Sequence, residues 1–221
     1  NLRTDKYVHL YSSKDDPYSL SDNAVYSLCE DREGGIWVGS YFGGVDYYPK
    51  SYTYFEKYYP KDGDNNLHGK RVREFCEDNK GILWIGTEDG GLNRFDPKTK
   101  TFSFFAPSFG FTNIHGLCMV GDKLWVGTFS KGLKIVDTNT GNILKTYQKN
   151  DSPRSLIDNS IFAICRTTTG DIYLGTMFGL LRYNEQTDDF DRIEELAGRF
   201  VYDIKEDSGG NLWLATYVNG A

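Results

Sequence analysis

Four carboxylates in expected turns are the first candidates for chemistry: Asp22, Glu88, Asp89 and Asp158. A glycosidase needs two such groups about 5 to 10 Å apart, one acting as acid and the other as base or nucleophile. No spacing in the sequence marks one pair for this work. Glycosidase or lyase chemistry therefore stays an alternative, and we predict no catalytic residue.

Thiols and imidazoles are the next candidates. The cysteines Cys29, Cys76, Cys118 and Cys165 and the three histidines have no spacing typical of a zinc site, so we predict neither a metal nor a cofactor. Each cysteine stands seven or eight residues before an aromatic residue, which predicts equivalent positions in repeated strands. Packed sheets lie about 10 Å apart, whereas a disulfide needs Cα atoms within about 7 Å. We predict four free, buried thiols.

The elements that position these groups repeat along the chain. The repeats align on Trp37, Trp84, Trp125, Tyr173 and Trp213, at intervals of 47, 41, 48 and 40 residues. Each repeat begins with a strand in which apolar and polar residues alternate. A turn, an aromatic-x-Gly-Thr strand and a glycine turn come next, and further strands complete the unit. Such a meander has two apolar faces and must stack on its neighbours. The pattern predicts an all-β fold, a β-propeller of four-stranded antiparallel blades.

The blade boundaries follow from the same alignment. We predict an outer strand of a preceding blade at 1–19, complete blades at 20–66, 67–112, 113–155 and 156–198, and a partial blade at 199–221. Four complete and two partial blades favour a segment of a longer array. A closed five-bladed ring, in which Tyr7 to Tyr11 completes the last blade, is the alternative. Only residues 193–199 have helical character.

Composition excludes some partners. The net charge is -6, the pI is near 5.1, and no Lys/Arg run interrupts this balance, so nucleic acid is not expected as a partner. No stretch approaches the roughly 18 apolar residues of a membrane-spanning helix, and residues 1–10 lack the apolar core of a signal peptide.

The repeated motif itself is interpreted as structural. The glycine of the aromatic-x-Gly-Thr strand lets a neighbouring blade approach, and the threonine suits a strand and can bond a nearby turn. Asp31, Asp78 and Asp207 are expected to form Asx turns between first and second strands.

Function is therefore sought in loops. In a meander blade, the loop before the first strand and the loop between the second and third strands emerge on one face, which we call the loop face. On this face we expect aromatic rings that stack on a sugar, beside polar groups that bind its hydroxyls. We expect some of the rings to fill the central channel instead. The predicted ligand-binding residues are Tyr41, Phe42, His68, Arg71, Glu88, Asp89, Phe129, Lys131, Phe178, Arg199 and Tyr217.

One segment of the chain resembles the repeat of a known protein family. The segment LSDNAVYSLCEDREGGIWVGSYFGGVDYYP resembles the two-component regulator propeller repeat, with its Leu-x-x-Asn-x-Val, Asp-x-x-Gly-x-Leu-Trp-x-Gly-Thr and Gly-Gly-Leu elements. The likeness extends over essentially the whole chain. The departures are a shortened turn before Trp125, Tyr173 in place of Trp, and Ala215 in place of Gly.

The resemblance implies a parent protein of a particular kind. Similar repeats form the periplasmic sensor region of hybrid two-component regulators from gut Bacteroidetes, where two seven-bladed propellers precede an immunoglobulin-like module, a membrane helix, and kinase and regulator domains. The family recognises breakdown products of polysaccharides, often oligosaccharides. The resemblance thus implies part of a seven-bladed propeller, a periplasmic location, a small carbohydrate ligand, and a membrane-anchored, homodimeric parent whose histidine kinase lies elsewhere.

Three functions remain for testing. The leading hypothesis is a non-enzymatic, carbohydrate-sensing propeller that takes part in signal transduction. A propeller glycosidase or lyase is the second. A protein-interaction scaffold is the third, and it predicts a large apolar patch instead of a polar, aromatic-lined pocket.

Overall fold

The computed structural model describes residues 4–16, 18–50, 56–61, 63, 65–104, 113–217 and 220. The chain divides into two compact units, residues 1–62 and 63–221, and each is described by itself. All sheets of both units are antiparallel meanders.

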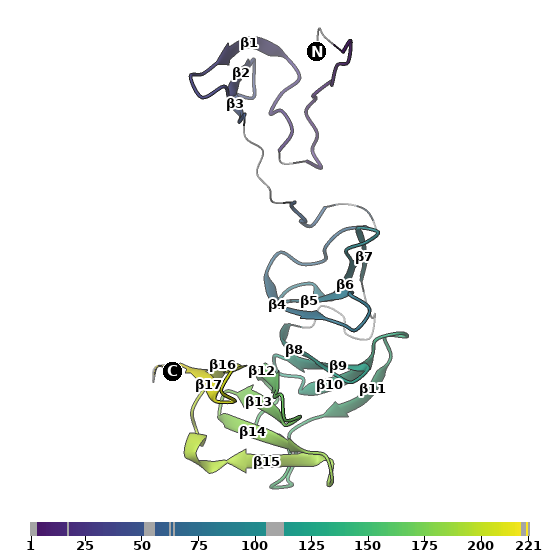
Figure 1. Ribbon diagram of the computed structural model, residues 1–221, viewed down its shortest axis with the longest axis vertical. Helices are drawn as coiled ribbons and strands as arrows, with labels where there is room; N and C mark the ends of the chain where they lie inside the picture. Colours follow the sequence, from purple (N-terminus) through teal and green to yellow (C-terminus); the bar gives the residue numbers. More distant parts are fainter. Residues whose placement is uncertain are drawn as a thin grey trace. The chain divides into compact units, whose positions relative to one another are not determined.

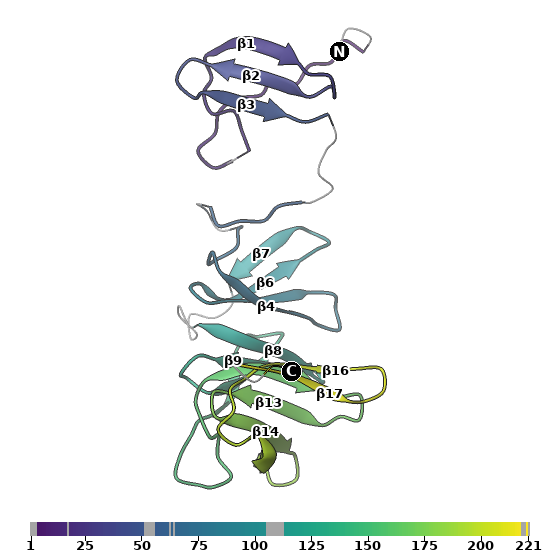
Figure 2. The same ribbon diagram turned by 90° about the vertical axis from the view of Figure 1, so that its left-hand side faces the viewer.

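The first unit contains one three-stranded sheet in the order β1 (Val25–Glu30), β2 (Ile36–Ser40) and β3 (Val45–Tyr48), visible in Figure 2. A fourth strand is predicted for this segment, and residues 51–55 of it lie outside the described residues. Tyr7 to Tyr11 are described and belong to no strand. Their role as an outer strand stays a prediction.

The second unit contains three four-stranded sheets and one pair of strands (Figure 1). The first sheet is β4 (Val72–Glu77), β5 (Leu83–Thr87), β6 (Gly91–Asp96) and β7 (Thr101–Phe104). The second is β8 (Ile114–Val120), β9 (Lys123–Thr128), β10 (Leu133–Asp137) and β11 (Ile143–Tyr147). The third is β12 (Ile161–Arg166), β13 (Ile172–Thr176), β14 (Gly179–Asn184) and β15 (Asp189–Ile193). The pair is β16 (Val201–Glu206) and β17 (Leu212–Thr216).

Successive sheets of the second unit pack through their first strands, β4 on β8, β8 on β12 and β12 on β16. A glycine on the second strand of each four-stranded sheet permits this approach. A Cβ on Gly86 would lie 2.6 Å from Ile114, and one on Gly127 would lie 2.9 Å from Ile161. Each of these isoleucines begins the next sheet along the chain. The prediction that these glycines allow a neighbouring blade to approach is confirmed.

The threonine that ends each second strand of the second unit closes the following turn. The hydroxyls of Thr87, Thr128, Thr176 and Thr216 donate to the carbonyls of Gly91, Gly132, Gly179 and Gly220, at 3.0, 2.7, 2.8 and 2.7 Å. Because the acceptor is the carbonyl of the turn glycine, the hydroxyl holds the ends of the second and third strands together. The predicted role of this threonine is confirmed.

Asp31, Asp78 and Asp207 form the predicted Asx turns. Each accepts two backbone N–H groups, from the residues two and four positions later, through one carboxylate oxygen. The second oxygen accepts the indole N–H of the tryptophan six residues later, at 3.0, 3.0 and 2.9 Å. This indole bond lowers the pKa of Asp207 to about 2, with help from the backbone N–H groups. Sequence analysis did not anticipate the indole bond.

The core lies between the sheets of the second unit. One apolar cluster joins Trp84 and Leu92 of one sheet to Ile114 and Leu124 of the next, and two further clusters repeat this arrangement along the unit. Burial between sheets removes the apolar surface that an isolated meander would expose.

The cysteines occupy the predicted equivalent positions. Cys29, Cys76, Cys118 and Cys165 are the cross-strand partners of Trp37, Trp84, Trp125 and Tyr173. All four are free, as predicted. The prediction of full burial is wrong. Cys29 is exposed, because the described residues of the first unit form one sheet and no second sheet among them covers it, and the others are half-buried.

Helical structure is limited to one short turn in the described part of the chain, η1 (Glu194–Leu196), inside the segment predicted to have helical character. Among the described residues, no helix has the length and apolar character to cross a membrane. The all-β prediction with four-stranded antiparallel meanders is confirmed.

Candidate functional site

The two sets of loops predicted to share a face do so in both units. In four of the five described sheets, the first residue after the second strand donates its backbone N–H to a residue of the loop before the first strand. These bonds are Tyr41 to Ala24, Glu88 to Arg71, Phe129 to Asn113 and Tyr217 to Phe200, at 2.9, 2.9, 2.9 and 3.0 Å.

On the loop face of the first unit, Tyr41 and Phe42 lie together and are exposed, with ring centroids 4.3 Å apart. Tyr41 also contacts Tyr26, at 4.9 Å. Asp22 holds this loop, because its carboxylate accepts the backbone N–H of Phe42 at 3.0 Å. That bond lowers the pKa of Asp22.

On the loop face of the second unit, the structure brings four polar groups together. Arg71 lies 3.9 Å from the carboxylate of Glu88 and 3.7 Å from that of Asp89. His115 Nε2 lies 4.0 Å from Glu88. His115 is only 6% exposed, and neither ring nitrogen has a hydrogen-bond partner among the described residues. Burial lowers the pKa of His115, and the nearby charge of Arg73 lowers it further while Glu88 opposes the shift.

Aromatic rings surround this polar group. Phe162 contacts His115 at a centroid distance of 4.7 Å and Phe200 at 4.5 Å. Arg73 on β4 lies 4.3 Å from the ring of Tyr202 on β16, so the inner strands of two non-adjacent sheets meet here. Phe162, which is not one of the rings predicted for the loop face, is buried and packs between His115 of β8 and Tyr202 of β16.

Three other predicted rings remain open to solvent. Phe129, Phe178 and Tyr217 are 43%, 54% and 67% exposed. Phe129 lies 5.8 Å from His115, and Tyr217 lies 5.9 Å from Phe200.

The remaining predicted residues are more dispersed. His68 stacks on Phe104 with centroids 4.6 Å apart, and this places it beside β7. Lys131, on the loop that also carries Phe129, and Arg199, on the loop before β16, are exposed. In the second unit, some predicted residues thus lie around His115 and others lie apart from it. The role of the whole predicted set in binding stays a prediction.

The four candidate carboxylates bind the protein's own backbone or an arginine. Asp89 Oδ1 accepts the backbone N–H groups of Lys70 and Arg71, and Asp158 accepts that of Ser160 at 2.6 Å. The pKa of Asp89 is lowered, first by the Arg71 backbone bond. A glycosidase acid needs a raised pKa, so these contacts favour a structural role. Among the described residues, no group of three or more potential metal ligands lies together.

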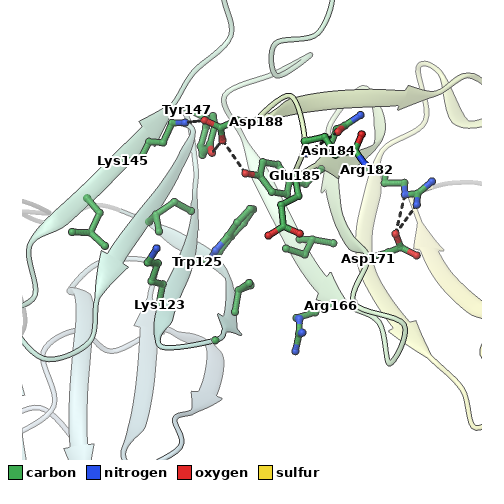
Figure 3. Close-up of a pocket in the computed structure, with 18 of the residues that line it drawn as sticks. Lys123, Trp125, Lys145, Tyr147, Arg166, Asp171, Arg182, Asn184, Glu185 and Asp188 are labelled. Carbon is green, nitrogen blue, oxygen red and sulfur yellow. Dashed lines mark hydrogen bonds and ion pairs between the residues drawn. The ribbon is translucent and has the colours of Figure 1, made fainter.

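A cleft of about 950 Å³ opens between the second and third sheets of the second unit (Figure 3). Lys123, Trp125, Lys145 and Tyr147 line one side, and Arg166, Asp171 and Arg182 line the other. Its rim is made by the hairpins β8–β9, β12–β13 and β14–β15. In a meander these hairpins lie at the opposite end of the strands from the loop face.

Asp188 links the two walls of the cleft. Its carboxylate accepts hydrogen bonds from Lys145 Nζ and the Tyr147 hydroxyl of one sheet and from the Tyr183 hydroxyl of the other, the last at 2.8 Å (Figure 3). The Lys145 bond is the main reason that the pKa of Asp188 falls to about 2. Arg182 pairs with Asp171 deeper along the third sheet, at 2.6 Å.

Sequence analysis predicted none of the cleft residues as site residues. One feature of the sequence points to the cleft. The turn before Trp125 is shorter than in the other repeats, so the repeat pattern is interrupted there. That departure removes the aspartate six residues before the tryptophan, a position held by Met119.

The comparisons with known proteins agree with this architecture. The family model described as two component regulator propeller matches residues 19–42, 66–89 and 195–218. No curated protein matches the chain.

Solved structures share the fold at low sequence identity. The extracellular domain of a putative hybrid two component system from B. thetaiotaomicron is 20% identical with a TM-score of 0.53, over 93% of this chain and 34% of that one. The WD40 beta propeller domain of Doa1 is 14% identical with a TM-score of 0.56, over 89% and 61%. Virginiamycin B lyase from Staphylococcus aureus is 12% identical with a TM-score of 0.52, over 86% and 62%.

The chain spans about a third of the extracellular domain that it resembles. These structural matches establish the fold, and the three matched segments establish the repeat. The chain therefore has a β-propeller fold, and three of its segments match the two-component regulator propeller repeat.

Proposed function

We propose that the chain is a ligand-recognising propeller from the extracytoplasmic sensor region of a hybrid two-component system, and that it binds an oligosaccharide at its loop face. A periplasmic location and a membrane-anchored, dimeric parent belong to the same proposal. The matched repeats and the likeness to an extracellular domain of such a system support it.

One observation carries the choice of face. Phe129 presents an exposed ring beside His115. The charged group of Glu88 lies beside His115, and that of Arg71 lies beside Glu88. Apolar rings and hydrogen-bonding groups side by side suit the two kinds of surface on a sugar, its C–H face and its hydroxyls. The engagement of Asp89 and Asp158 by backbone N–H groups supports binding in preference to hydrolysis.

The experiment is a thermal-shift screen of the chain against an oligosaccharide library, followed by chromatography of each hit for products. We expect a sugar to raise the melting temperature without being cleaved. Arg71→Gln and Phe129→Ala should each reduce the shift. Arg192→Gln, on the exposed outer strand β15, is the matched control and should leave it unchanged.

Other outcomes have distinct meanings. Cleavage of the sugar would replace the proposal with an enzymatic one. Lack of any response to sugars, together with a stable protein complex on the loop face, would favour the scaffold function.

A further inference from the structure

The indole of Trp125 differs from the other tryptophan side chains in its bonding. Trp37, Trp84 and Trp213 each donate their indole N–H to the aspartate six residues earlier, at 3.0, 3.0 and 2.9 Å. Met119 holds that position for Trp125 and has no acceptor of comparable strength. Within the described part of the chain, the Trp125 N–H donates to no protein group, and its nitrogen is open to solvent instead of sealed in the core.

Trp125 is only 5% exposed and lines the cleft between the second and third sheets. Because the N–H opens on the cleft and no protein group accepts it, it is available to donate a hydrogen bond to a molecule bound there. The volume of about 950 Å³ is within the range of small-molecule sites.

The cleft has an apolar floor. Ile135 and Leu144 of the second sheet and Ile172 of the third lie there beside the rings of Tyr147 and Tyr183. These side chains form a small apolar area within a mainly polar lining, and an apolar side chain of a ligand can rest on it.

Charges of both signs remain available at the rim. Lys145 and Arg182 are committed to Asp188 and Asp171. Lys123 and Arg166, and likewise Asp122 and Glu185, line the cleft without an ion pair to any described residue. Two positive and two negative groups complement a ligand that carries one charge of each sign.

We propose that this cleft binds a short peptide with free termini. Its carboxylate pairs with Arg166 or Lys123, its ammonium group with Glu185 or Asp122, an apolar side chain rests on the floor, and a backbone carbonyl accepts the Trp125 N–H. The site is separate from the loop face, so it is independent of sugar recognition there.

The test is calorimetric titration of the chain with di- to tetrapeptides that contain apolar residues. Each peptide is used with free termini and in a form acetylated and amidated at its ends. We expect free peptides to bind and the blocked forms to bind on the order of tenfold more weakly, because charged hydrogen bonds are lost. Binding of the free form should also weaken as salt is added, since the rim charges are exposed to solvent.

Variants locate the site. Trp125→Phe keeps a ring but removes the N–H and should weaken binding about fivefold to tenfold. Trp84→Phe, whose N–H already binds Asp78, is the matched control and should leave affinity unchanged. Arg166→Gln should also weaken binding, and Arg71→Gln on the loop face should not. Circular dichroism of each variant establishes that it is folded.

Three results would overturn the proposal: no peptide binds, the blocked peptides bind as well as the free ones, or Trp125→Phe and Arg166→Gln both bind normally. Binding of a neutral oligosaccharide that Trp125→Phe abolishes would also overturn it, because the cleft would then be a sugar site.

Discussion

Asp188, on the hairpin between β14 and β15, binds Lys145 on β11, so one carboxylate joins two neighbouring sheets. Asp188 has a positive φ of 57°, which aspartate tolerates better than most residues. The hairpin conformation thus directs the carboxylate toward the neighbouring sheet, where the Tyr147 hydroxyl also reaches it, while the Tyr183 hydroxyl donates to it from its own sheet.

Asp188→Asn tests this link. Asparagine also tolerates the positive φ, so the change removes mainly the charge. We expect the free energy of unfolding to fall by about 1 kcal/mol at pH 7, a small value because the ion pair is half-exposed. Urea denaturation measures it, and Asp151→Asn on an exposed loop is the control.

The same pair predicts a pH dependence. The folded pKa of Asp188, about 2, lies below its ordinary value of 3.8, so its contribution to stability is present above pH 4 and is lost as pH falls toward 2. Urea denaturation at pH 4 and pH 2.5 should show a smaller loss for Asp188→Asn than for the unmodified chain. Equal losses would mean that the carboxylate is not stabilised by these partners.

Gly127→Ala tests the packing of adjacent sheets. The added Cβ would lie 2.9 Å from a side-chain carbon of Ile161 and 3.0 Å from its carbonyl oxygen, and a backbone atom cannot move away easily. We expect a loss of about 1 to 3 kcal/mol in the free energy of unfolding. Gly209→Ala, in an exposed turn, should stay within about 1 kcal/mol of the unmodified chain. A Gly127→Ala protein of unchanged stability would show that the sheets are not in such close contact.

His115 predicts a second pH dependence, in the mildly acidic range. Burial lowers its pKa from the ordinary value of 6.5, so the unfolded chain binds more protons and stability falls as pH drops below about 6.5. His115→Phe should reduce the difference in melting temperature between pH 7.5 and pH 5.5. His9→Phe, at an exposed position, should retain the full difference. A His115→Phe protein with an unchanged difference would contradict the buried, neutral histidine.

The cysteines should differ in reactivity. Burial raises the pKa of Cys76 and Cys118 to about 11, so little thiolate is present at neutral pH, whereas Cys29 is exposed. Maleimide labelling at pH 7.5 followed by mass spectrometry should modify Cys29 first. Labelling under denaturing, non-reducing conditions should modify all four. Rapid modification of Cys76 in the native protein, or fewer than four labels after unfolding, would contradict the structure.

Much of the fold was predictable because each repeat encodes its own local geometry. The alternating strands, the glycine turns and the aromatic-x-Gly-Thr motif indicate four-stranded meanders, and they predict equivalent first-strand positions for the cysteines, where the structure places Cys76 opposite Trp84. These features depend on backbone preference and on contacts within one sheet. The Asx turn of Asp78 is equally local, since its partners lie within six residues.

The candidate sites depended on contacts between sheets, which the sequence alone does not specify. Phe162 and Phe129 look alike in the sequence, yet one is buried between inner strands and the other remains exposed. The cleft is formed by side chains from two sheets, and Lys145 and Asp188 meet there although 43 residues separate them. The sequence by itself determined the blade and its repetition, because those follow from local bonding. Only the tertiary structure decided which rings fill the core and where the cleft opens, because those depend on how neighbouring sheets share their surfaces.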